Sequence, residues 1–548
     1  MNSIFYRVYS KSIFEVKLSK FKNIHFILFS IFPVIFIYSQ NIHLLPFQEL
    51  IIPLIILIGS SILIWSVSTL ISKNSIKSSL FVSLFFVVFF SYGHVYNILS
   101  GISIFDMDIS RHRFILIPFI AALIFGTLFL LKTKRKLNNL SPILNVVSIT
   151  IVFIAVFNLG INISQENYFD VNDQSDEKFL GVGASTESFS DMFSAENENI
   201  IDASKTNADP TNPDIYYIIL DEYGSQPALK NFLDYDNSSF LSEIKTKDFF
   251  IFSPSYTNYP TTVQSLSSSL NMKYINYLSN EAGVESKNYH LLNQLLSKNQ
   301  VMNILQNKHY NIINMGALWG PNNEFTYVDD NRCEFKEFNR DSLMRELIQI
   351  TMLSYAQERL VEQGRRDRVL CVFDEIPKLN EEFSSPKFVF AHIMLPHAPY
   401  IFGPNGEHVT PGNSLNNEPW DPKHAHVDQI KFANKKLIPL IEIILNKNPN
   451  SIIILQGDTG SAFNGNWRSP SNDLIIERMS NLNAIYLPNG NYELFENTQT
   501  PINTFRIIFN EYFNTDYTLL ENKMYWSTGS TPYLHDDVTN LLVENDGI

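Results

Sequence analysis

The stretch IYYIILDEYG, Ile215–Gly224, decides the fold that this sequence predicts. Six apolar or aromatic residues in a row predict a short buried strand, which stops at the adjacent acids Asp221 and Glu222. A Tyr-Gly pair then turns the chain. In an open α/β sheet, ligands bind just beyond the carboxyl ends of the strands, so paired acids placed there can form the floor of a site. An ordinary strand end beside a turn is the alternative interpretation of the same residues.

The part of the chain after Pro213 repeats this pattern, with short apolar strands alternating with amphipathic helices. Such alternation predicts an α/β domain whose mostly parallel sheet is sandwiched by helices. Its roughly 335 residues can bury a large core without help from disulfides. The expected strands are Ile215–Leu220, Phe249–Phe252, Ile312–Met315, Phe388–Met394, Ile452–Leu455 and Ala484–Leu487. The expected helices include Thr262–Leu278, Tyr289–Leu305, Asp341–Tyr355, Val427–Leu445 and Thr504–Phe513.

The first third of the chain is nearly all apolar, in contrast to the whole protein, which has 45% hydrophobic residues and a net charge of -14. Five of its segments are long enough to cross a bilayer, which takes about 20 apolar residues each. The first resembles a signal peptide in length, but it lacks a small-residue cleavage site and is followed by four more spans, so we interpret it as an anchor. The segments lie near Ile24–Tyr38, Leu45–Ile71, Ser79–Leu99, Phe114–Leu131 and Ile143–Ile163.

Lys and Arg residues gather in alternate loops between these segments. Five precede the first span, two separate the second and third, and four separate the fourth and fifth. The loop between the first and second has none, and the loop between the third and fourth carries two acids, with Arg111 and Arg113 only at its far end. By the positive-inside rule, the N-terminus is therefore cytoplasmic. An odd number of spans then places everything after Ile163 outside, in the periplasm or the extracellular space. The sequence predicts a multi-pass protein of the inner or plasma membrane.

The segment between the spans and the α/β domain is acidic and polar with little periodicity, which predicts a flexible tether. The expected organisation is a cytoplasmic N-terminus (1–23), a transmembrane bundle of five helices (24–163), an acidic flexible linker (164–213) and the α/β domain (214–548). Within that domain, Cys333 and Cys371 can form a disulfide in an oxidising compartment or stay as two buried thiols.

A candidate nucleophile lies in TNYPTTVQSLSSSLN, Thr257–Asn271. Pro260 breaks the preceding extended segment and apolar residues then follow at helical spacing, so Thr261 and Thr262 lie at a helix N-terminus. Unpaired N–H groups and the helix dipole favour an anion there. A Thr at this position is commonly a simple cap. The alternative is that Thr262 is a nucleophile, activated by a metal that nearby acids hold.

Two later stretches add candidate ligands. In FAHIMLPHAPY, Phe390–Tyr400, His397 follows a strand between two prolines and could bind a metal or donate to a phosphoryl or sulfuryl oxygen. His392 lies inside the strand and is more typical of a core histidine. In SIIILQGDTG, Ser451–Gly460, another buried strand ends in Asp458. Three strands thus bring candidate ligands to one edge of the sheet, namely Asp221 with Glu222, His397 and Asp458. Oxygen ligands with some imidazole suit Zn, Mn, Mg or Ca rather than copper.

The order of these motifs resembles the alkaline phosphatase/sulfatase superfamily. With the preceding spans, the chain is similar to the membrane-anchored, sulfatase-like branch that includes lipoteichoic acid synthases and phosphoethanolamine transferases, over roughly Asp214 to Phe513. The C/S-x-P-x-R motif of sulfatases is absent, so their formylglycine mechanism is not expected. The resemblance implies metal acids at Asp221, Glu222 and Asp458, a nucleophile at Thr262 and a histidine near the transferred group at His397.

The sequence departs from this family at Thr459, where active relatives of the transferase branch carry a His that binds the metal. A Thr hydroxyl is a far weaker ligand than an imidazole. Three outcomes stay open: another histidine completes the site, metal binding is weak, or the domain is degenerate. The nearest candidates for a replacement are His392, His424 and His426.

For an active domain, the resemblance implies metal-dependent transfer of a phospho-substituent, of phosphoethanolamine or phosphoglycerol type, to a cell-surface glycan or lipid. The expected metal is Zn or Mn ahead of Mg or Ca, and the expected substrates are a phospholipid or a glycan. One alternative is a phosphodiesterase or sulfuric ester hydrolase of the same fold. Another is a catalytically degenerate protein that binds glycan or scaffolds polysaccharide assembly. The acidic balance disfavours a nucleic-acid role.

Overall fold

A computed structural model describes residues 23–41, 47–99, 103–104, 107–108, 112–135, 137–165, 212–316, 325–333, 342–409, 421–496 and 499–544. The chain forms two compact units. The first comprises Met1–Ala195 and Lys336–Val361, and the second comprises Glu196–Phe335 and Glu362–Ile548. The expected cytoplasmic N-terminus and acidic linker lie almost wholly outside the described residues.

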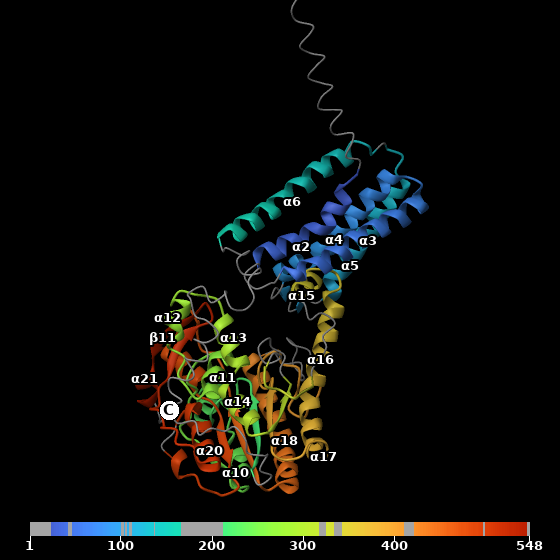
Figure 1. The fold of residues 1–548 in the computed structure, drawn as a ribbon. Coiled ribbons are helices and arrows are strands. Elements are labelled where there is room, and N and C mark those ends of the chain that lie inside the picture. Colours follow the sequence, from blue (N-terminus) through green and yellow to red (C-terminus); the bar gives the residue numbers. More distant parts are fainter. Residues whose placement is uncertain are drawn as a thin grey trace, which may run out of the picture. The chain divides into compact units, whose positions relative to one another are not determined.

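The first unit is built from apolar helices (Figure 1). They are α2 (His25–Gln40), α3 (Gln48–Ser72), α4 (Ser75–Leu99), α5 (His112–Lys132) and α6 (Leu140–Gln165), with the paired strands β1 (Ser103–Ile104) and β2 (Met107–Asp108) between α4 and α5. Among the described residues, α3 to α6 are long and apolar enough to cross a membrane, and α2 is a shorter apolar helix. The expected membrane anchor of apolar helices is confirmed, whereas the number of spans and their orientation stay predictions.

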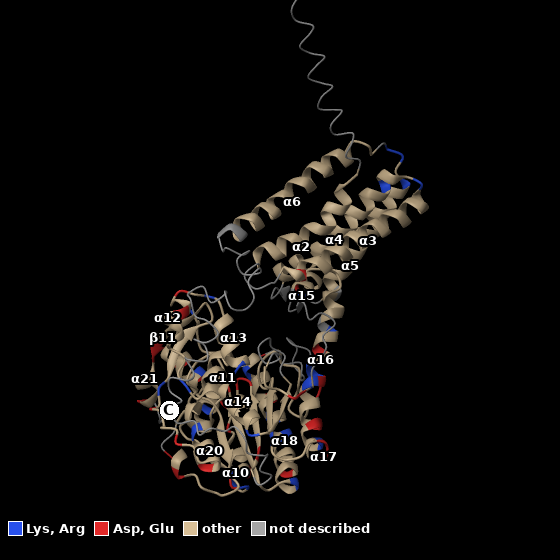
Figure 2. Ribbon diagram, viewed as in Figure 1, with Lys and Arg blue, Asp and Glu red and all other residues tan. Residues whose placement is uncertain are grey.

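The charged connections of this bundle lie at one end of it. Lys77 Nζ donates to the carbonyl oxygens of Leu131 (3.2 Å) and Thr133 (2.9 Å), so the α3–α4 and α5–α6 connections are neighbours. Lys and Arg residues gather at this end, while the helices between the ends are almost free of charged residues (Figure 2). This arrangement agrees with the alternation of charged loops in the sequence.

The first unit also contains a segment from the middle of the sequence. It includes α15 (Ser342–Gln349) and the first two turns of α16 (Ser354–Glu375). The spacing of apolar residues predicts one helix over Asp341–Tyr355, but the chain turns between α15 and α16. At this turn the Thr351 hydroxyl donates to Ile348 O (2.7 Å) and accepts from Leu353 N (3.1 Å), in competition with helical hydrogen bonds.

The second unit contains a seven-stranded mixed sheet. In spatial order its strands are β4 (Phe250–Ile251), β9 (Asn483–Tyr486), β8 (Ser451–Gly457), β3 (Asp214–Leu220), β7 (Lys387–Ile393), β5 (Asn311–Met315) and β6 (Asp330–Arg332). The five strands from β8 to β6 are parallel, whereas β9 and β4 are antiparallel to their neighbours. The predicted mostly parallel sheet is therefore confirmed, with β3 at its centre.

Helices cover both faces of this sheet, because alternate residues of β3 enter two separate cores. Tyr216 and Ile218 pack with residues of α10, α16 and α18, whereas Ile215 and Tyr217 pack with residues of α11, α13, α14 and α20. The helices of the unit besides α16 are α9 (Gln226–Leu233), α10 (Ser238–Lys245), α11 (Thr262–Asn271), α12 (Leu278–Ala282), α13 (His290–Ser297), α14 (Gln300–Asn307), α17 (Leu379–Glu382), α18 (Pro422–Lys447), α19 (Asn472–Met479), α20 (Thr504–Phe513) and α21 (Thr539–Val543).

Two expected helices are shorter than the apolar spacing predicts. The helix expected over Thr262–Leu278 ends at Asn271, because Met272 adopts a left-handed conformation with φ +55°. The helix expected over Tyr289–Leu305 is divided into α13 and α14. There Asn299 caps α14, its side chain accepting a hydrogen bond from Met302 N (2.9 Å).

A disulfide and a C-terminal hairpin complete the second unit. Cys333, directly after β6, is bonded to Cys371 in α16, which selects the disulfide from the two alternatives left by the sequence. The strands β10 (Tyr525–Thr528) and β11 (Thr531–Asp537) pair beside α11, where buried Gln264 donates to Ser527 Oγ (2.8 Å). The hairpin thus supports the helix that carries Thr262.

Candidate active site

The central strands bring their following residues to one edge of the sheet. Leu220 of β3 lies opposite Ile393 of β7 and Gly457 of β8 in the parallel register. Asp221 and Asp458 come directly after Leu220 and Gly457, and Asp221 N donates to Ile393 O (3.0 Å). The two acids therefore leave adjacent parallel strands at the same level, as the sequence predicts.

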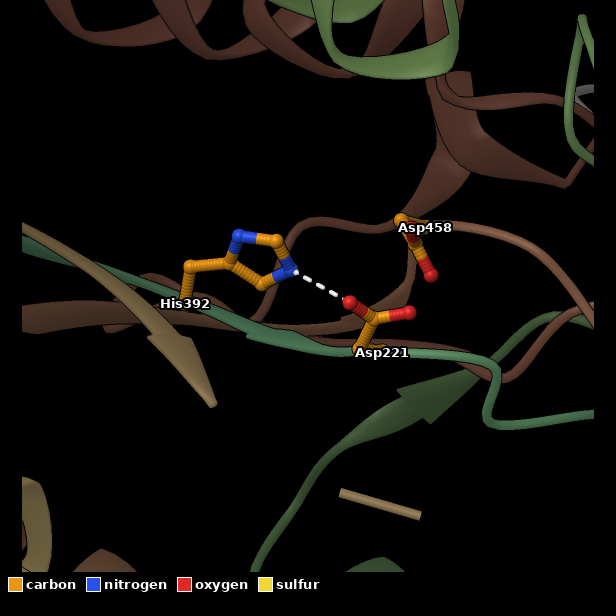
Figure 3. Close-up of side chains that lie close together, drawn as sticks. All are labelled: Asp221, His392 and Asp458. Atoms are coloured by element: carbon orange, nitrogen blue, oxygen red, sulfur yellow. Dashed lines mark ion pairs between the residues drawn. The ribbon is translucent and has the colours of Figure 1, made fainter. Parts of the chain in front are cut away.

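The structure groups three side chains at this edge, namely Asp221, His392 and Asp458 (Figure 3). One ligand atom from each lies within 4.8 Å of the others, and His392 Nε2 is 3.3 Å from Asp221 Oδ2. All three side chains are buried. Of the three histidines that the sequence offers as replacements at Thr459, His392 of β7 is the one that lies with the two acids.

Two oxygens of this group need a partner. Asp458 Oδ1 accepts hydrogen bonds from Glu222 N (2.9 Å) and Thr459 N (2.7 Å). Within the described part of the chain, Asp221 Oδ1 and Asp458 Oδ2 are buried and accept no hydrogen bond. A buried carboxylate oxygen without a partner is costly, and a divalent cation between the two carboxylates would satisfy both. The residues present therefore fit a metal ion bound by two carboxylates and one imidazole.

The pKa values of the two acids reflect their proximity. Burial and the charge of Asp221 raise the pKa of Asp458 to about 6. Burial also acts to raise the pKa of Asp221, but its interactions with His397, His392 and Arg478, among them a hydrogen bond from His392, outweigh burial and lower that pKa. Two full negative charges are thus unfavourable at this buried place, and a cation would stabilise them.

Thr262 lies beside Asp458 at the first residue of α11. The preceding Thr261 is extended, with φ −114° and ψ 146°, and its hydroxyl donates to Gln264 Oε1 (2.7 Å). Ser265, one turn into the helix, donates to the backbone oxygen of Asp458 (2.7 Å) and ties α11 to the end of β8. The Thr262 hydroxyl is among the groups that act to lower the pKa of Asp458, and its side chain is half-buried rather than enclosed.

Glu222 does not join the three grouped ligands. Its backbone is left-handed, with φ +63°, and its Oε1 accepts a hydrogen bond from Arg478 Nη1 (2.6 Å). Its Oε1 is also 3.7 Å from His397 Nε2. The expected second metal acid thus forms an ion pair beside the candidate metal site.

His397 lies at the rim of the same site. The backbone N–H of His397 donates to the backbone oxygen of Asp221 (3.1 Å), and the His397 side chain is 38% exposed. Burial acts to lower the pKa of His397, but the carboxylates of Asp221 and Glu222 outweigh burial and raise it. An accessible imidazole with a raised pKa suits the donor role that the sequence predicts.

Arg478, near the end of α19, holds together the loops that carry these residues. Its Nε donates to Pro260 O (2.8 Å) and its Nη1 donates to Gly460 O (2.8 Å) as well as to Glu222. Pro260 comes two residues before Thr262, and Gly460 two residues after Asp458. The buried guanidinium therefore contacts the loops after β3 and β8 and the start of α11.

The other candidate histidines have different surroundings. His424 is 68% exposed and lies 3.6 Å from Asp428 Oδ2, within its own helix. His426 is completely buried between the rings of Tyr400 and Phe463, and burial lowers its pKa to about 3. The sequence signal for His392 is its place one residue before the end of β7, at the edge where the acids meet. Arg478 gave no comparable signal.

A family model described as Sulfatase matches residues 213–510, more than half of the chain. The chain belongs to the sulfatase family. The match includes β3, β7 and β8 with their candidate ligands, and it follows the apolar helices that the sequence predicts for a membrane-anchored, sulfatase-like protein. No curated protein sequence matches this sulfatase-family chain.

Several solved structures are similar to this chain at low sequence identity. The C-terminal periplasmic domain of EcEptC from Escherichia coli, in complex with Zn, is 11% identical with a TM-score of 0.41, covering 61% of this chain and 94% of that chain. Lipooligosaccharide phosphoethanolamine transferase A from Neisseria meningitidis, an integral membrane protein, is 12% identical with a TM-score of 0.37. The match covers 89% of this chain and 94% of that chain. A putative sulfatase from Bacteroides thetaiotaomicron is 9% identical with a TM-score of 0.37, and the match covers 58% of this chain and 78% of that chain. These similarities concern the fold alone.

Proposed function

We propose that this protein is a metal-dependent transferase with Thr262 as its nucleophile, moving a phosphoethanolamine- or phosphoglycerol-type substituent to a cell-surface glycan or lipid. The observation that carries the proposal is the half-buried Thr262 hydroxyl beside Asp458, next to two buried carboxylate oxygens that accept no hydrogen bond from the described residues. A hydroxyl is a weak nucleophile until a base or a metal activates it. The group of Asp221, His392 and Asp458 would hold that metal, with Zn or Mn preferred.

The reaction has two displacements at phosphorus. In the first, Thr262 Oγ bonds to phosphorus while its proton passes to solvent, and the bond from phosphorus to the lipid oxygen breaks. We assign to His397 the donation of a proton to that leaving oxygen. In the second, an acceptor hydroxyl bonds to phosphorus while its proton passes to the now neutral His397. The bond from phosphorus to Thr262 Oγ breaks, and that oxygen takes up a proton from solvent. When bound, a divalent metal supplies a lowered pKa for the hydroxyl and charge screening for the phosphoryl oxygens.

The membrane anchor supports a lipid donor. A phospholipid headgroup is presented at the surface to which the helices α3 to α6 would attach the protein. The Lys- and Arg-rich end of the bundle supports a cytoplasmic N-terminus, with the sulfatase domain in the periplasm or outside the cell. The same site with water as the acceptor would be a phosphodiesterase.

Mass spectrometry of the covalent intermediate tests the proposal. Full-length protein in vesicles of phosphatidylethanolamine or phosphatidylglycerol, loaded with Zn or Mn, should gain the mass of one phospho-substituent on Thr262. The Thr262→Ala protein should gain none, and the neighbouring Thr261→Ala protein should react normally. A substituent that is released without an acceptor would support hydrolysis. A native protein that binds metal but never gains the mass, with either lipid, would contradict transfer through Thr262.

A further inference from the structure

We propose that residues 342–361, which we term the docking segment, form a second attachment of the sulfatase domain to its membrane anchor, independent of the acidic linker. The docking segment lies inside the region that the Sulfatase family model matches, yet the structure groups it with the N-terminal helices. The chain therefore passes between the two units three times, at 195–196, 335–336 and 361–362. The inference does not depend on the proposed reaction.

Apolar side chains of α15 form part of the core of the helical unit. Leu343 and Leu347 are buried in one cluster with Phe26, Tyr38 and Phe90, among other residues of α2, α3 and α4. Because helices that share a continuous core are held by packing, α15 behaves as an additional helix of the anchor.

Hydrogen bonds fix the docking segment to two helices. Glu49, in the first turn of α3, accepts a hydrogen bond from Leu343 N (3.1 Å) at the start of α15. A carboxylate at a helix N-terminus satisfies free N–H groups and complements the helix dipole. At the other end of α15, Gly93 N donates to Ile350 O (3.0 Å) and Met352 N donates to Phe89 O (3.2 Å).

Gly93 makes this close approach of two backbones possible. A Cβ atom at position 93 would lie 2.5 Å from both Gln349 O and Ile350 Cα. These are backbone atoms, so a side chain at this position requires the docking segment to move away. The glycine thus provides a means to disturb the contact from the anchor side alone.

The contacts of the docking segment lie at the end of α3 and α4 that is opposite their Lys-containing end. By the positive-inside rule, this is the end expected outside the cytoplasm. Glu49 lies at the start of α3 and Gly93 near the end of α4, whereas Lys73 and Lys77 lie at the opposite ends of these helices. Exposed apolar side chains of the docking segment, such as Leu360 at 67%, suit a lipid surface. The disulfide between Cys333 and Cys371 closes the base of the loop that carries the segment.

Cleavage of the linker tests this attachment. A protease site is inserted within residues 166–211 of the full-length protein, which is then placed in membrane vesicles. Cleavage at this site cuts the linker that joins the N-terminal helices to the sulfatase domain. We expect most of the released sulfatase fragment to stay with the membranes through a high-salt wash, and to co-purify in mild detergent with a tagged N-terminal fragment. Appearance of the native fragment in the supernatant would overturn the proposal.

Three variants separate docking from adsorption to lipid. Gly93→Leu should release most of the fragment although the sequence of the fragment is unchanged, so misfolding of the fragment would not explain its release. Leu343→Glu combined with Leu347→Glu should have the same effect. Leu360→Glu, at an exposed position of the same segment, should leave the fragment bound. If Gly93→Leu retains the fragment and Leu360→Glu releases it, lipid adsorption rather than docking holds the domain.

Discussion

Arg478 Nη1 donates to Glu222 Oε1 across 2.6 Å, and this contact separates Glu222 from the group of candidate metal ligands that its neighbour Asp221 joins. The two adjacent acids of one strand end therefore have different surroundings. One is buried with two other potential ligands, and the other balances a guanidinium and an imidazole.

This difference predicts opposite results for two conservative variants. Glu222→Gln should keep a near-native metal content, because the three grouped ligands are unchanged. Asp221→Asn should lose the metal, because it removes a negative ligand from a buried site. Metal analysis of the two purified proteins measures the difference. Equal loss in both would show that Glu222 is itself a ligand.

Arg478→Gln should lower the free energy of unfolding by about 2 to 3 kcal/mol, because it removes three hydrogen bonds and leaves Glu222 without its partner. The free energy of unfolding of Arg478→Lys should lie between those of the native protein and Arg478→Gln, since one ammonium cannot reproduce the separate contacts of a guanidinium. Denaturant unfolding in mild detergent provides the measurement. Exposed Arg468→Gln is the control and should change the value by less than about 0.5 kcal/mol. A native-like Arg478→Gln protein would contradict the holding role.

Gly460 of the G-D-T-G motif should not tolerate a side chain. A Cβ atom there would lie 2.2 Å from Glu477 O and 2.4 Å from Ser480 O, both backbone atoms at the end of α19. We expect Gly460→Ala to destabilise the protein by about 2 to 3 kcal/mol through overpacking. Gly529→Ala is the matched control, because its Cβ would meet Tyr289 Oη at an ordinary 3.6 Å. Similar melting temperatures for the two variants would contradict this description of the loop.

The disulfide should contribute through the loop it closes. Cys333 and Cys371 are 38 residues apart, and the loss of chain entropy for such a loop corresponds to about 4 kcal/mol of unfolding free energy. Cys333→Ser combined with Cys371→Ser should therefore unfold at clearly lower denaturant concentration than the native protein. The native protein treated with a reductant should match the double variant. A midpoint that neither change alters would show that other contacts already order the loop.

The strands and most of the site could be predicted from the sequence because their signals are local. An apolar run such as Ile215–Leu220 predicts a buried strand in an α/β domain, and an acid directly after such a strand lies at the edge of the sheet. His392 was harder to assign, because a histidine within a buried strand has the same local pattern as a core residue. Arg478 acts on Pro260, which is 218 residues away in the chain, and no local pattern shows this contact.

The docking segment illustrates the same limit for a helix. Its amphipathic spacing predicts a helix, and α15 is helical, but the pattern does not say which core the apolar face enters. Leu343 and Leu347 pack with buried helical residues that lie more than 250 residues earlier in the chain. Their partners depend on tertiary contacts that only the folded structure shows.

Metal content of the purified full-length protein tests the central claim most directly. The native protein should contain about one Zn or Mn ion per chain, bound by Asp221, His392 and Asp458. His392→Ala should lower the metal affinity by at least about 100-fold, whereas His424→Ala, at an exposed position, should retain it. A native protein without metal, beside a Thr459→His protein that binds it, would contradict the account and indicate a degenerate site.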